Sequence, residues 1–479
     1  MAKRFCTVLL SLAFTSVCAL QASAANWPVF GYDPARRGFN PAERTLTVGN
    51  VHRLHARWQI SLGAVADTSP ILLDRVRVGR SFRTLLFETT KRGETLAIEA
   101  LSGHILWRFR TTGPNYTHSA PAADPASDRI FVPGVDGKVH KLLAANGHEL
   151  HALGFPARIT LMPMTEADEA ALNLANGYLY AVTSGYNGDA NPYDGHIVSV
   201  RLSDGATAVW NSLCSFYRKL PGPHTCPEQR SGIWSRGGAV VDPDPSMGGR
   251  VYVATGNGNF DANKGGHDYG DSVVSLSSDL SDLLGSYTPT DYDRLQAFDL
   301  DLGSTSPAML PAQPHSQTPW MLVQGGKDAV LKLINRAAPP GVDDELQLIN
   351  LPDGLFATPA VWTDSAANAW IFMGFPNVVQ AYSLHTNAGG TSKLALMWQL
   401  NAGQTFGEGT SPVVANGIVF VAFDGAIVAL NALSGHILWS SAMRGAGKTI
   451  GAVHWQSPIV VNGWVYCSDQ NGRLTAYSL

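Results

Sequence analysis

The sequence predicts an all-β fold, an eight-bladed propeller of four-stranded antiparallel blades, on three observations. The phrase Ala97-Ile-Glu-Ala-Leu-Ser-Gly-His-Ile-Leu-Trp107 returns almost unchanged as Ala429-Leu-Asn-Ala-Leu-Ser-Gly-His-Ile-Leu-Trp439. The chain of 479 residues holds 48 Gly and 28 Pro with only 15% charged residues, which suits short strands joined by tight turns. Near the N-terminus, residues 54–60 also form a Trp strand that has no unit before it. Since one such unit cannot bury its apolar face alone, the repetition predicts stacked units.

Each unit shows the same order of elements. A Ser/Thr/Ala-Pro step leads into two apolar strands, then an Asp-Gly or Asn-Gly turn, a third strand and a fourth strand that carries Trp. Asx-Gly pairs tolerate the positive φ of tight antiparallel turns, so they mark hairpins. The two clearest units run from Thr410 to Trp439 and from Gln456 to Leu479.

Weaker copies of the same unit fill the rest of the chain, at spacings made irregular by inserted loops. They are expected from Thr68 onward, from Ser119 onward, and at Tyr178–Trp210, Gly238–Tyr287, Ser306–Arg336 and Thr358–Trp398. The last unit ends without a Trp strand, whereas residues 54–60 form a Trp strand without a unit. Pairing the two would close the ring and hide the edges that could otherwise pair with other chains.

The repeated Trp is interpreted as packing, not as a ligand stack. At a fixed place on each outer strand, the indole is expected to cover the backbone of the next blade while its N–H finds a carbonyl. His104 and His436 beside it occupy turns and are given no functional role.

Residues 1–24 show the pattern of a cleaved secretory signal. Lys3 and Arg4 precede an apolar run from Val8 to Leu20, and Ala22-Ser-Ala24 supplies the small residues of a cleavage site. We therefore expect residues 25–479 to form a single propeller domain in the periplasm or outside the cell, without a membrane span. A formal charge of -4 provides no basic stripe, so nucleic acid is not an expected partner.

Two of the cysteines bracket a loop rich in Pro, Gly and charge. Cys214 and Cys226 are expected to form a disulfide that clamps the loop insertion at 211–231, which an exported location permits. Cys467 lies in an apolar run and is expected to be a buried thiol. Neither loop cysteine begins a C-x-x-C-H motif, so covalent haem is excluded.

The pattern Ala-x-x-x-x-x-Gly-x-x-x-Trp, together with the opening Trp27-Pro-Val-Phe-Gly-Tyr-Asp33, resembles the pyrroloquinoline-quinone (PQQ) repeat of the quinoprotein alcohol dehydrogenase-like propellers. The resemblance covers nearly all of residues 25–479. That superfamily contains quinone-dependent dehydrogenases of alcohols and sugars, which are oxidoreductases, and also non-catalytic members such as the lipoprotein of the outer-membrane barrel-assembly machinery. Fold alone therefore does not decide the function.

The resemblance implies a set of site residues between Ser231 and Arg336. Trp234 corresponds to the Trp that stacks on the quinone, and Asn257 to the Asn that binds Ca²⁺. Asp299 stands where the dehydrogenases place the catalytic Asp, and Lys327 where a basic residue meets the quinone oxygens. These residue types suit a tricyclic quinone with a bound cation and a base that takes the alcohol proton. The resemblance thus implies PQQ and Ca²⁺ as cofactors and a small alcohol or sugar as substrate.

A second argument for calcium is local. Asn257, Asn259, Asp261 and Asn263 alternate, with Asp268 further on, as oxygen ligands would in a calcium loop. Asn257 and Asp261 are the metal ligands that this pattern predicts. A polar, Gly-rich turn has the same composition and stays an alternative.

The chain also departs from the dehydrogenase pattern. The Glu expected to bind Ca²⁺ is missing before Gly195, no adjacent Cys pair is present, and Trp234 lies farther ahead of Asp242 than in the enzymes. These departures favour an alternative, a non-catalytic propeller that binds an envelope protein or a polymer. A sugar-binding or hydrolytic propeller is a weaker third hypothesis, because no paired carboxylates with a recognisable spacing support it.

Overall fold

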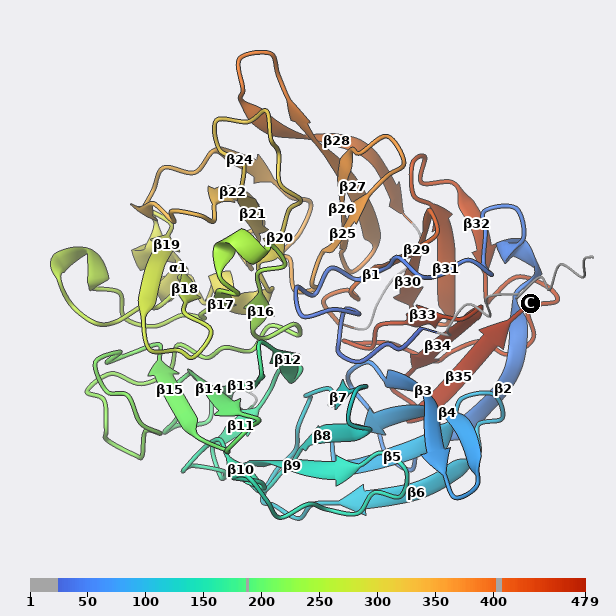
Figure 1. The fold of residues 1–479 in the computed structure, drawn as a ribbon. Helices are drawn as coiled ribbons and strands as arrows, with labels where there is room; N and C mark the ends of the chain where they lie inside the picture. Colours follow the sequence, from blue (N-terminus) through green and yellow to red (C-terminus); the bar gives the residue numbers. More distant parts are fainter. Residues whose placement is uncertain (1–24, 187–188, 402–406) are drawn as a thin grey trace, which may run out of the picture.

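The structure is a computed structural model that describes residues 25–186, 189–401 and 407–479. Its strands form eight sheets arranged around a central axis, so the predicted eight-bladed propeller is confirmed (Figure 1). The predicted signal peptide, residues 1–24, lies outside the described residues. No helix within the described ranges has the length and apolar character needed to cross a membrane.

Blades 1 to 3 follow the N-terminal segment, and the first strand of each is the innermost. Blade 1 contains β3 (Ile71–Val78), β4 (Ser81–Thr89), β5 (Glu94–Glu99) and β6 (Ile105–Arg110). Blade 2 contains β7 (Ala122–Asp124), β8 (Arg129–Pro133), β9 (Lys138–Leu143) and β10 (Ala157–Arg158). Blade 3 contains β11 (Glu166–Asp168), β12 (Asn173–Ala175), β13 (Tyr178–Gly185), β14 (His196–Arg201) and β15 (Thr207–Asn211).

Blades 4 and 5 carry the longest insertions. Blade 4 contains β16 (Val240–Val241), β17 (Val251–Ala254), β18 (Val273–Leu276), β19 (Leu283–Thr288) and β23 (Gly341–Val342). Blade 5 contains β20 (Ala308–Met309), β21 (Met321–Gln324), β22 (Val330–Asn335) and β24 (Gln347–Asn350). The helix α1 (Tyr292–Phe298) and four 3₁₀ turns complete the described helices: η1 (Val51–Arg53), η2 (Pro245–Met247), η3 (Ala262–Lys264) and η4 (Leu302–Ser304).

Blades 6 to 8 return the chain to its start. Blade 6 contains β25 (Ala360–Thr363), β26 (Ala369–Gly374), β27 (Val378–Thr386) and β28 (Ser392–Asn401). Blade 7 contains β29 (Val413–Ala415), β30 (Ile418–Phe423), β31 (Ala426–Asn431) and β32 (Ile437–Ser440), with β1 (Phe39–Asn40) beside β29. Blade 8 contains β33 (Ile459–Val461), β34 (Trp464–Ser468), β35 (Arg473–Ser478) and β2 (His55–Ser61).

The ring closes in blade 8 as the sequence predicts. The N-terminal strand β2 pairs antiparallel with β35, with His55 opposite Ser478 and Ser61 opposite Arg473. Closure therefore removes the free edge that the last blade would otherwise present. In Figure 1 the blue β2 lies beside the red β35 at the C-terminus.

A Trp on the outer strand locks each of four blades to the next one. The indole N–H donates to a backbone carbonyl across the blade junction: Trp58 to Ala100 (3.0 Å), Trp107 to Ala144 (3.0 Å), Trp398 to Ala432 (2.9 Å) and Trp439 to Leu54 (2.9 Å). The ring also covers a turn glycine, because a Cβ at Gly147 would lie 2.6 Å from Trp107 and one at Gly435 would lie 2.7 Å from Trp398. The predicted packing role of the repeated Trp is thus visible at these four junctions, while His104 and His436 are exposed turn residues.

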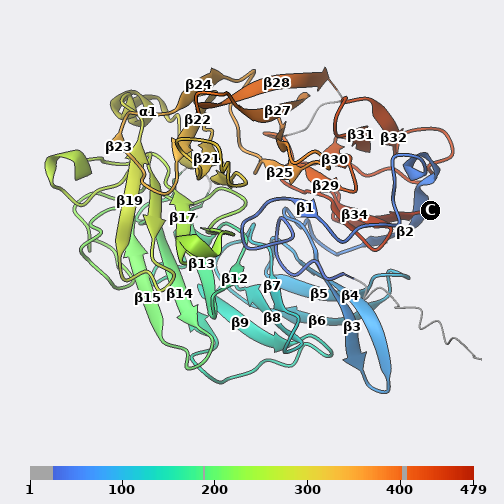
Figure 2. The same cartoon turned by 45° about the horizontal axis from the view of Figure 1, so that its top comes forward.

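The segment 25–40, called here the N-terminal strap, crosses the centre of the ring (Figures 1 and 2). It bonds to blades on both sides of the axis: Trp27 with Leu72, Pro28 with Ala123, Arg37 with Val361, Gly38 with Val414 and Asn40 with Val460. Arg36 is 1% exposed and donates to the carbonyls of Phe30, Ala171, Leu172 and Gly237. The strap therefore closes the channel at the level of the inner strands.

The predicted disulfide is present. Cys214 and Cys226 are bonded, with their Cα atoms 5.8 Å apart, and the bond closes the loop between β15 and blade 4. Cys467 is a buried free thiol in β34, as predicted.

The Trp–Gly contact between blades can be tested with two matched glycines. Gly435 (φ +71°) lies under Trp398, whereas Gly417 (φ +76°) has open space around its Cβ position. Both Gly→Ala variants incur the strain of positive φ, about 1–2 kcal/mol, but Gly435→Ala also overpacks the junction. We expect it to lower the free energy of unfolding by a further 1–3 kcal/mol or so in urea titrations. Equal losses for the two variants would contradict the interlock.

Candidate functional site

A cavity of about 200 Å³ opens at the axis of the propeller, beside blades 3, 4, 5 and 8. It is lined by Glu169, Ser184, Gly185, Tyr186, Asp189, Tyr193, Gly232, Trp234, Arg236, Asn257, Asp299, Asp301, Lys327 and Trp455. Several of these residues come just before an inner strand or between β11 and β12, whereas the strap contacts the strands themselves. The strap thus lies deeper in the channel than the cavity.

The four residues that the sequence assigns to a quinone site all line this cavity. Trp234 precedes β16 and Asn257 follows β17, so both belong to blade 4. Asp299 follows α1, and Lys327 follows β21 of blade 5. The structure therefore brings Trp234, Asn257, Asp299 and Lys327 together. In the chain, the strands β16 to β21 and the helix α1 separate Trp234 from Lys327.

Lys327 joins two aspartates at the cavity wall. Its Nζ lies 3.1 Å from Asp299 Oδ2 and 2.5 Å from Asp301 Oδ2. Asp299 ends α1 in the left-handed conformation (φ +56°) and keeps an exposed side chain, whereas Asp301 is only 4% exposed. The backbone N–H of Asn257 donates to the other Asp301 oxygen at 2.5 Å. Asp301 thus holds Lys327 and Asn257 in place, while Asp299 faces the solvent side of the cavity.

The charges of this group follow from burial and pairing. Burial alone would lower the pKa of Lys327, but Asp301 and Asp299 outweigh it and raise that pKa, so the ammonium stays protonated. Burial raises the pKa of Asp301, and Lys327 and the Asn257 N–H oppose the rise. Sequence reasoning assigned no role to Asp301, although its spacing of two from Asp299 was visible in the Asp299-Leu-Asp301 motif.

Aromatic rings line part of the cavity or pack behind its lining. The Lys327 Nζ lies 5.3 Å from the centroid of the Trp234 ring, which contacts Phe356 (6.0 Å) and Trp455 (6.5 Å). A planar quinone needs such an aromatic face with a cation beside it. Arg236 and Trp455 add polar hydrogens without partners, at Nη1 and Nε1. On these observations the residues present fit a planar, oxygen-rich cofactor.

The predicted metal ligands are not brought together. Asn257 lines the cavity, but Asp261 does not, and its Oδ1 accepts the backbone N–H of Asp268 at 2.9 Å. Asn259 donates to Asp268 Oδ2 at 2.7 Å, so this loop uses its polar atoms to hold itself together. Among the described residues, no three or more His, Cys, Asp or Glu side chains are arranged to hold a metal ion.

An acid–imidazole chain surrounds the axis beside the cavity, and sequence reasoning missed it. Its links are His118 Nδ1 to Glu169 (3.0 Å), His118 Nε2 to Asp67 (3.8 Å), His454 Nδ1 to Asp67 (2.9 Å) and His454 Nε2 to Glu408 (3.1 Å). A local signal exists. Asp67, His118, Phe356 and Trp455 each stand three residues before the Pro of a Ser/Thr/Ala-Pro step, so that position faces the axis.

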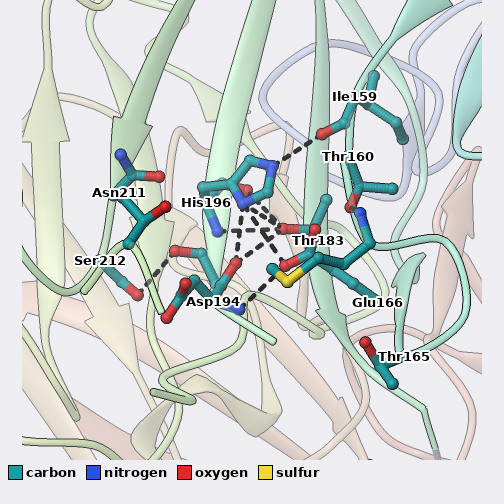
Figure 3. A network of polar contacts seen from close by, with 12 residues as sticks. Ile159, Thr160, Thr165, Glu166, Thr183, Asp194, His196, Asn211 and Ser212 are labelled. Carbon is teal, nitrogen blue, oxygen red and sulfur yellow. Dashed lines mark hydrogen bonds and ion pairs between the residues drawn. The ribbon is translucent and has the colours of Figure 1, made fainter. Parts of the chain in front are cut away.

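A buried network anchors the cavity wall that carries Tyr193 and Asp189 (Figure 3). Glu166 Oε1 accepts the backbone N–H of Asp194 at 3.0 Å. The ring nitrogens of His196 lie 2.8 Å from the Asp194 carbonyl and 2.7 Å from the Ile159 carbonyl. His196 Nδ1 also lies 2.9 Å from the Thr183 hydroxyl and 3.8 Å from Glu166 Oε1, so the ring joins the two strands β13 and β14 to this carboxylate. Burial, and then Glu166, raise the pKa of Asp194 to about 7.

His454 makes the stability of the ring depend on pH. Burial alone would lower its pKa, but Asp67 and Glu408 raise it from 6.5 to about 9. A pKa that is higher in the folded state gives stability that is complete below the unfolded value and lost as pH rises through the folded one. We expect His454→Gln to cost the protein about 2–3 kcal/mol near pH 6 and much less near pH 10, measured by urea unfolding. A cost that is the same at both pH values would contradict this pairing.

Comparisons with known proteins agree with this architecture. The family model described as the glucose/ethanol/alcohol dehydrogenase β-propeller domain matches residues 27–338, and the model for outer membrane protein assembly factor BamB matches residues 391–479. No curated protein sequence matches the chain significantly.

Solved structures of quinoprotein dehydrogenases are similar to the whole propeller. Quinohemoprotein alcohol dehydrogenase ADHIIG from Pseudomonas putida HK5 is 14% identical, with a TM-score of 0.67 over 95% of this chain and 80% of that one. A europium-containing methanol dehydrogenase is 14% identical, with a TM-score of 0.66 over 95% of this chain and 98% of that one. BamB from Moraxella catarrhalis is 12% identical, with a TM-score of 0.50 over 89% and 100%. At these identities the structures support the fold, and because the first family model covers more than half of the sequence, the chain belongs to the glucose/ethanol/alcohol dehydrogenase β-propeller family.

Proposed function

We propose that this protein is an exported, PQQ-dependent dehydrogenase that oxidises a small alcohol or sugar. The observation that carries the proposal is the meeting of Trp234, Asn257, Asp299 and Lys327 at one axial cavity. The resemblance gives these residues four separate tasks, and they come from separate elements of blades 4 and 5. The family membership and the dehydrogenase structures support the same reaction class.

Each residue has a task in that reaction. Trp234 offers a flat face for the quinone, and Lys327 places a positive charge beside that face. Asp299 accepts the hydroxyl proton of the alcohol, because its exposed carboxylate is paired with Lys327 and points to the open side of the site. Asp301 is a positioning residue that fixes Lys327 and the Asn257 backbone. When bound, PQQ supplies the electron acceptor for hydride.

A calcium ion belongs to the same proposal. Its protein ligands would be side-chain oxygens of Asn257 and Asp299, which both line the cavity. Ca²⁺ takes six to eight oxygens or so, and the quinone's own oxygens would complete such a set. The role of Asp261 stays a prediction, since its carboxylate serves the loop. Export to the periplasm or outside the cell also stays part of the proposal, and the disulfide suits such a location.

A change at Asp299 tests the proposed base. In dye-reduction assays with PQQ, Ca²⁺ and an alcohol and sugar panel, Asp299→Asn should lower kcat by about 10²- to 10⁴-fold with quinone affinity little changed. Asp291→Asn is the matched control, because Asp291 precedes the same helix, pairs with Arg294 and lies outside the cavity. Full activity in Asp299→Asn would remove Asp299 from the mechanism. Absence of both quinone binding and turnover in the unmodified protein would end the proposal as a whole.

Measuring PQQ binding at increasing calcium concentrations can show whether Asn257 or Asp261 binds the ion. Asn257→Ala should raise the calcium concentration needed for half-maximal binding by roughly tenfold or more, because it removes an oxygen from the cavity. Asp261→Ala should leave that concentration unchanged if the ion lies in the cavity. The reverse pattern would place the ion in the loop at 257–268 instead.

A binding propeller is the second candidate. The match of residues 391–479 to the BamB model favours it, as does the absence of the expected Glu and Cys pair in the sequence. A pull-down from envelope extracts that recovers a defined protein, combined with no quinone binding, would favour this candidate over the dehydrogenase.

A further inference from the structure

Three arginines of the described residues are deeply buried, and one of them, Arg236, lacks a full set of partners there. Arg36 makes four hydrogen bonds to backbone carbonyls. Arg336 pairs with Asp242 at 2.8 Å and donates to two further carbonyls. Arg236 is 4% exposed, and within the described residues its side chain donates one hydrogen bond, from Nη2 to the Trp234 carbonyl at 2.7 Å. Its Nη1 has no partner in the described chain.

Arg236 lines the cavity and is stacked on an indole. Its Cζ is 3.6 Å from the centroid of the Trp455 ring, and both residues line the cavity. The Trp455 Nε1 is also a buried donor without a partner. Two buried donors without partners, one of them charged, therefore belong to one guanidinium–indole stack that lines the cavity.

The acids near Arg236 are already engaged by histidines. Glu169 is bonded to His118, and Asp67 and Glu408 are bonded to His454. None of these carboxylates forms an ion pair with Arg236 within the described residues, although their charges act on it. Within the described residues the guanidinium is thus left without a carboxylate partner, although it donates to the Trp234 carbonyl and stacks on Trp455.

Lys327, the other cationic side chain that lines the cavity, already has carboxylate partners. Lys327 is shared between Asp299 and Asp301, so its charge is already compensated. A carboxylate that entered the cavity would be repelled by Glu169, Asp189, Asp299 and Asp301 along the wall. Arg236 is where such a group gains most, because burying an unpaired guanidinium is costly and a carboxylate accepts two parallel N–H bonds from it.

We propose that Arg236 and the Trp455 Nε1–H form a carboxylate-binding subsite in the cavity. The carboxylate is that of the quinone cofactor, in which case the subsite rests on the proposed function, or that of a hydroxy-acid substrate. Both sources offer the same chemistry to Arg236, and they can be told apart by probes.

The experiment compares the unmodified protein with Arg236→Met by calorimetric titration, with Ca²⁺ present throughout. The probes are PQQ, a phenanthroline quinone that lacks carboxylates, lactate, and propanediol as the uncharged counterpart of lactate. Loss of a charge-assisted pair should weaken the carboxylate probe by about ten- to a hundredfold and leave its uncharged counterpart unchanged. A loss confined to PQQ assigns the subsite to the cofactor, and a loss of lactate binding assigns it to the substrate.

The proposal and the proposed function can fail separately. If the unmodified protein binds no PQQ, the dehydrogenase is refuted, but the lactate pair still tests Arg236. If neither PQQ nor lactate binds Arg236→Met more weakly than the unmodified protein, the subsite is refuted.

A second readout needs no ligand. Replacing an unpaired buried cation by Met should raise the Tm of the ligand-free protein, whereas Arg336→Met, the matched control, should lower it by stranding Asp242. A Tm that falls as far in Arg236→Met as in Arg336→Met would show that Arg236 is a structural residue and would overturn the proposal.

Discussion

The contact of an indole with the glycine turn of the next blade is the interaction on which the architecture depends. The N–H of Trp107 reaches the carbonyl of Ala144 while its ring lies where a side chain at Gly147 would be, and Trp58, Trp398 and Trp439 donate to carbonyls in the same way. These contacts set the angle between adjacent blades at the rim. Because the rim is fixed, the inner strands converge on the axis, and residues that precede each inner strand meet there despite large separations in sequence.

That convergence explains why the centre of the molecule is polar. Blades contribute acids, histidines and cations to one small volume, and the buried ones among them need partners because an unpaired charge away from water is costly. Asp67 and Glu408 share His454, Glu169 takes His118, and Lys327 joins Asp299 to Asp301. Arg236 Nη1 has no partner within the described residues, and this buried donor therefore carries information about what the cavity receives. The buried Glu166–His196 network beside it keeps the wall of Tyr193 and Asp189 in position.

The fold could be predicted from the sequence because its determinants are local and repeated. The Asx-Gly turns, the Pro steps and the Trp strands recur within each unit, and the unpaired strand at 54–60 indicated the closure. Trp234, Asn257, Asp299 and Lys327 were predictable because each stands in a short stretch that resembles a known motif. His118 and Trp455 share only their place three residues before a Pro, and Arg236 follows Trp234 by two residues without a motif of its own. Asp261 shows where a motif is ambiguous. Alternating Asn and Asp residues suit a calcium loop, but they equally suit a turn whose side chains bond to its own backbone, as Asp261 does here.

The closure of blade 8 has a consequence for how the chain reaches this state. Arg57 and Ser478 bond across a sequence separation of 421, so the pairing of β2 with β35 is among the most non-local contacts a chain of this length can form. Contacts of this kind must overcome the entropy of closing a very long loop, and folding dominated by them is slow. Until β2 docks, both terminal edges of the ring are open to strands of other chains. The strand that completes the propeller is therefore also the one whose delay exposes the molecule to aggregation.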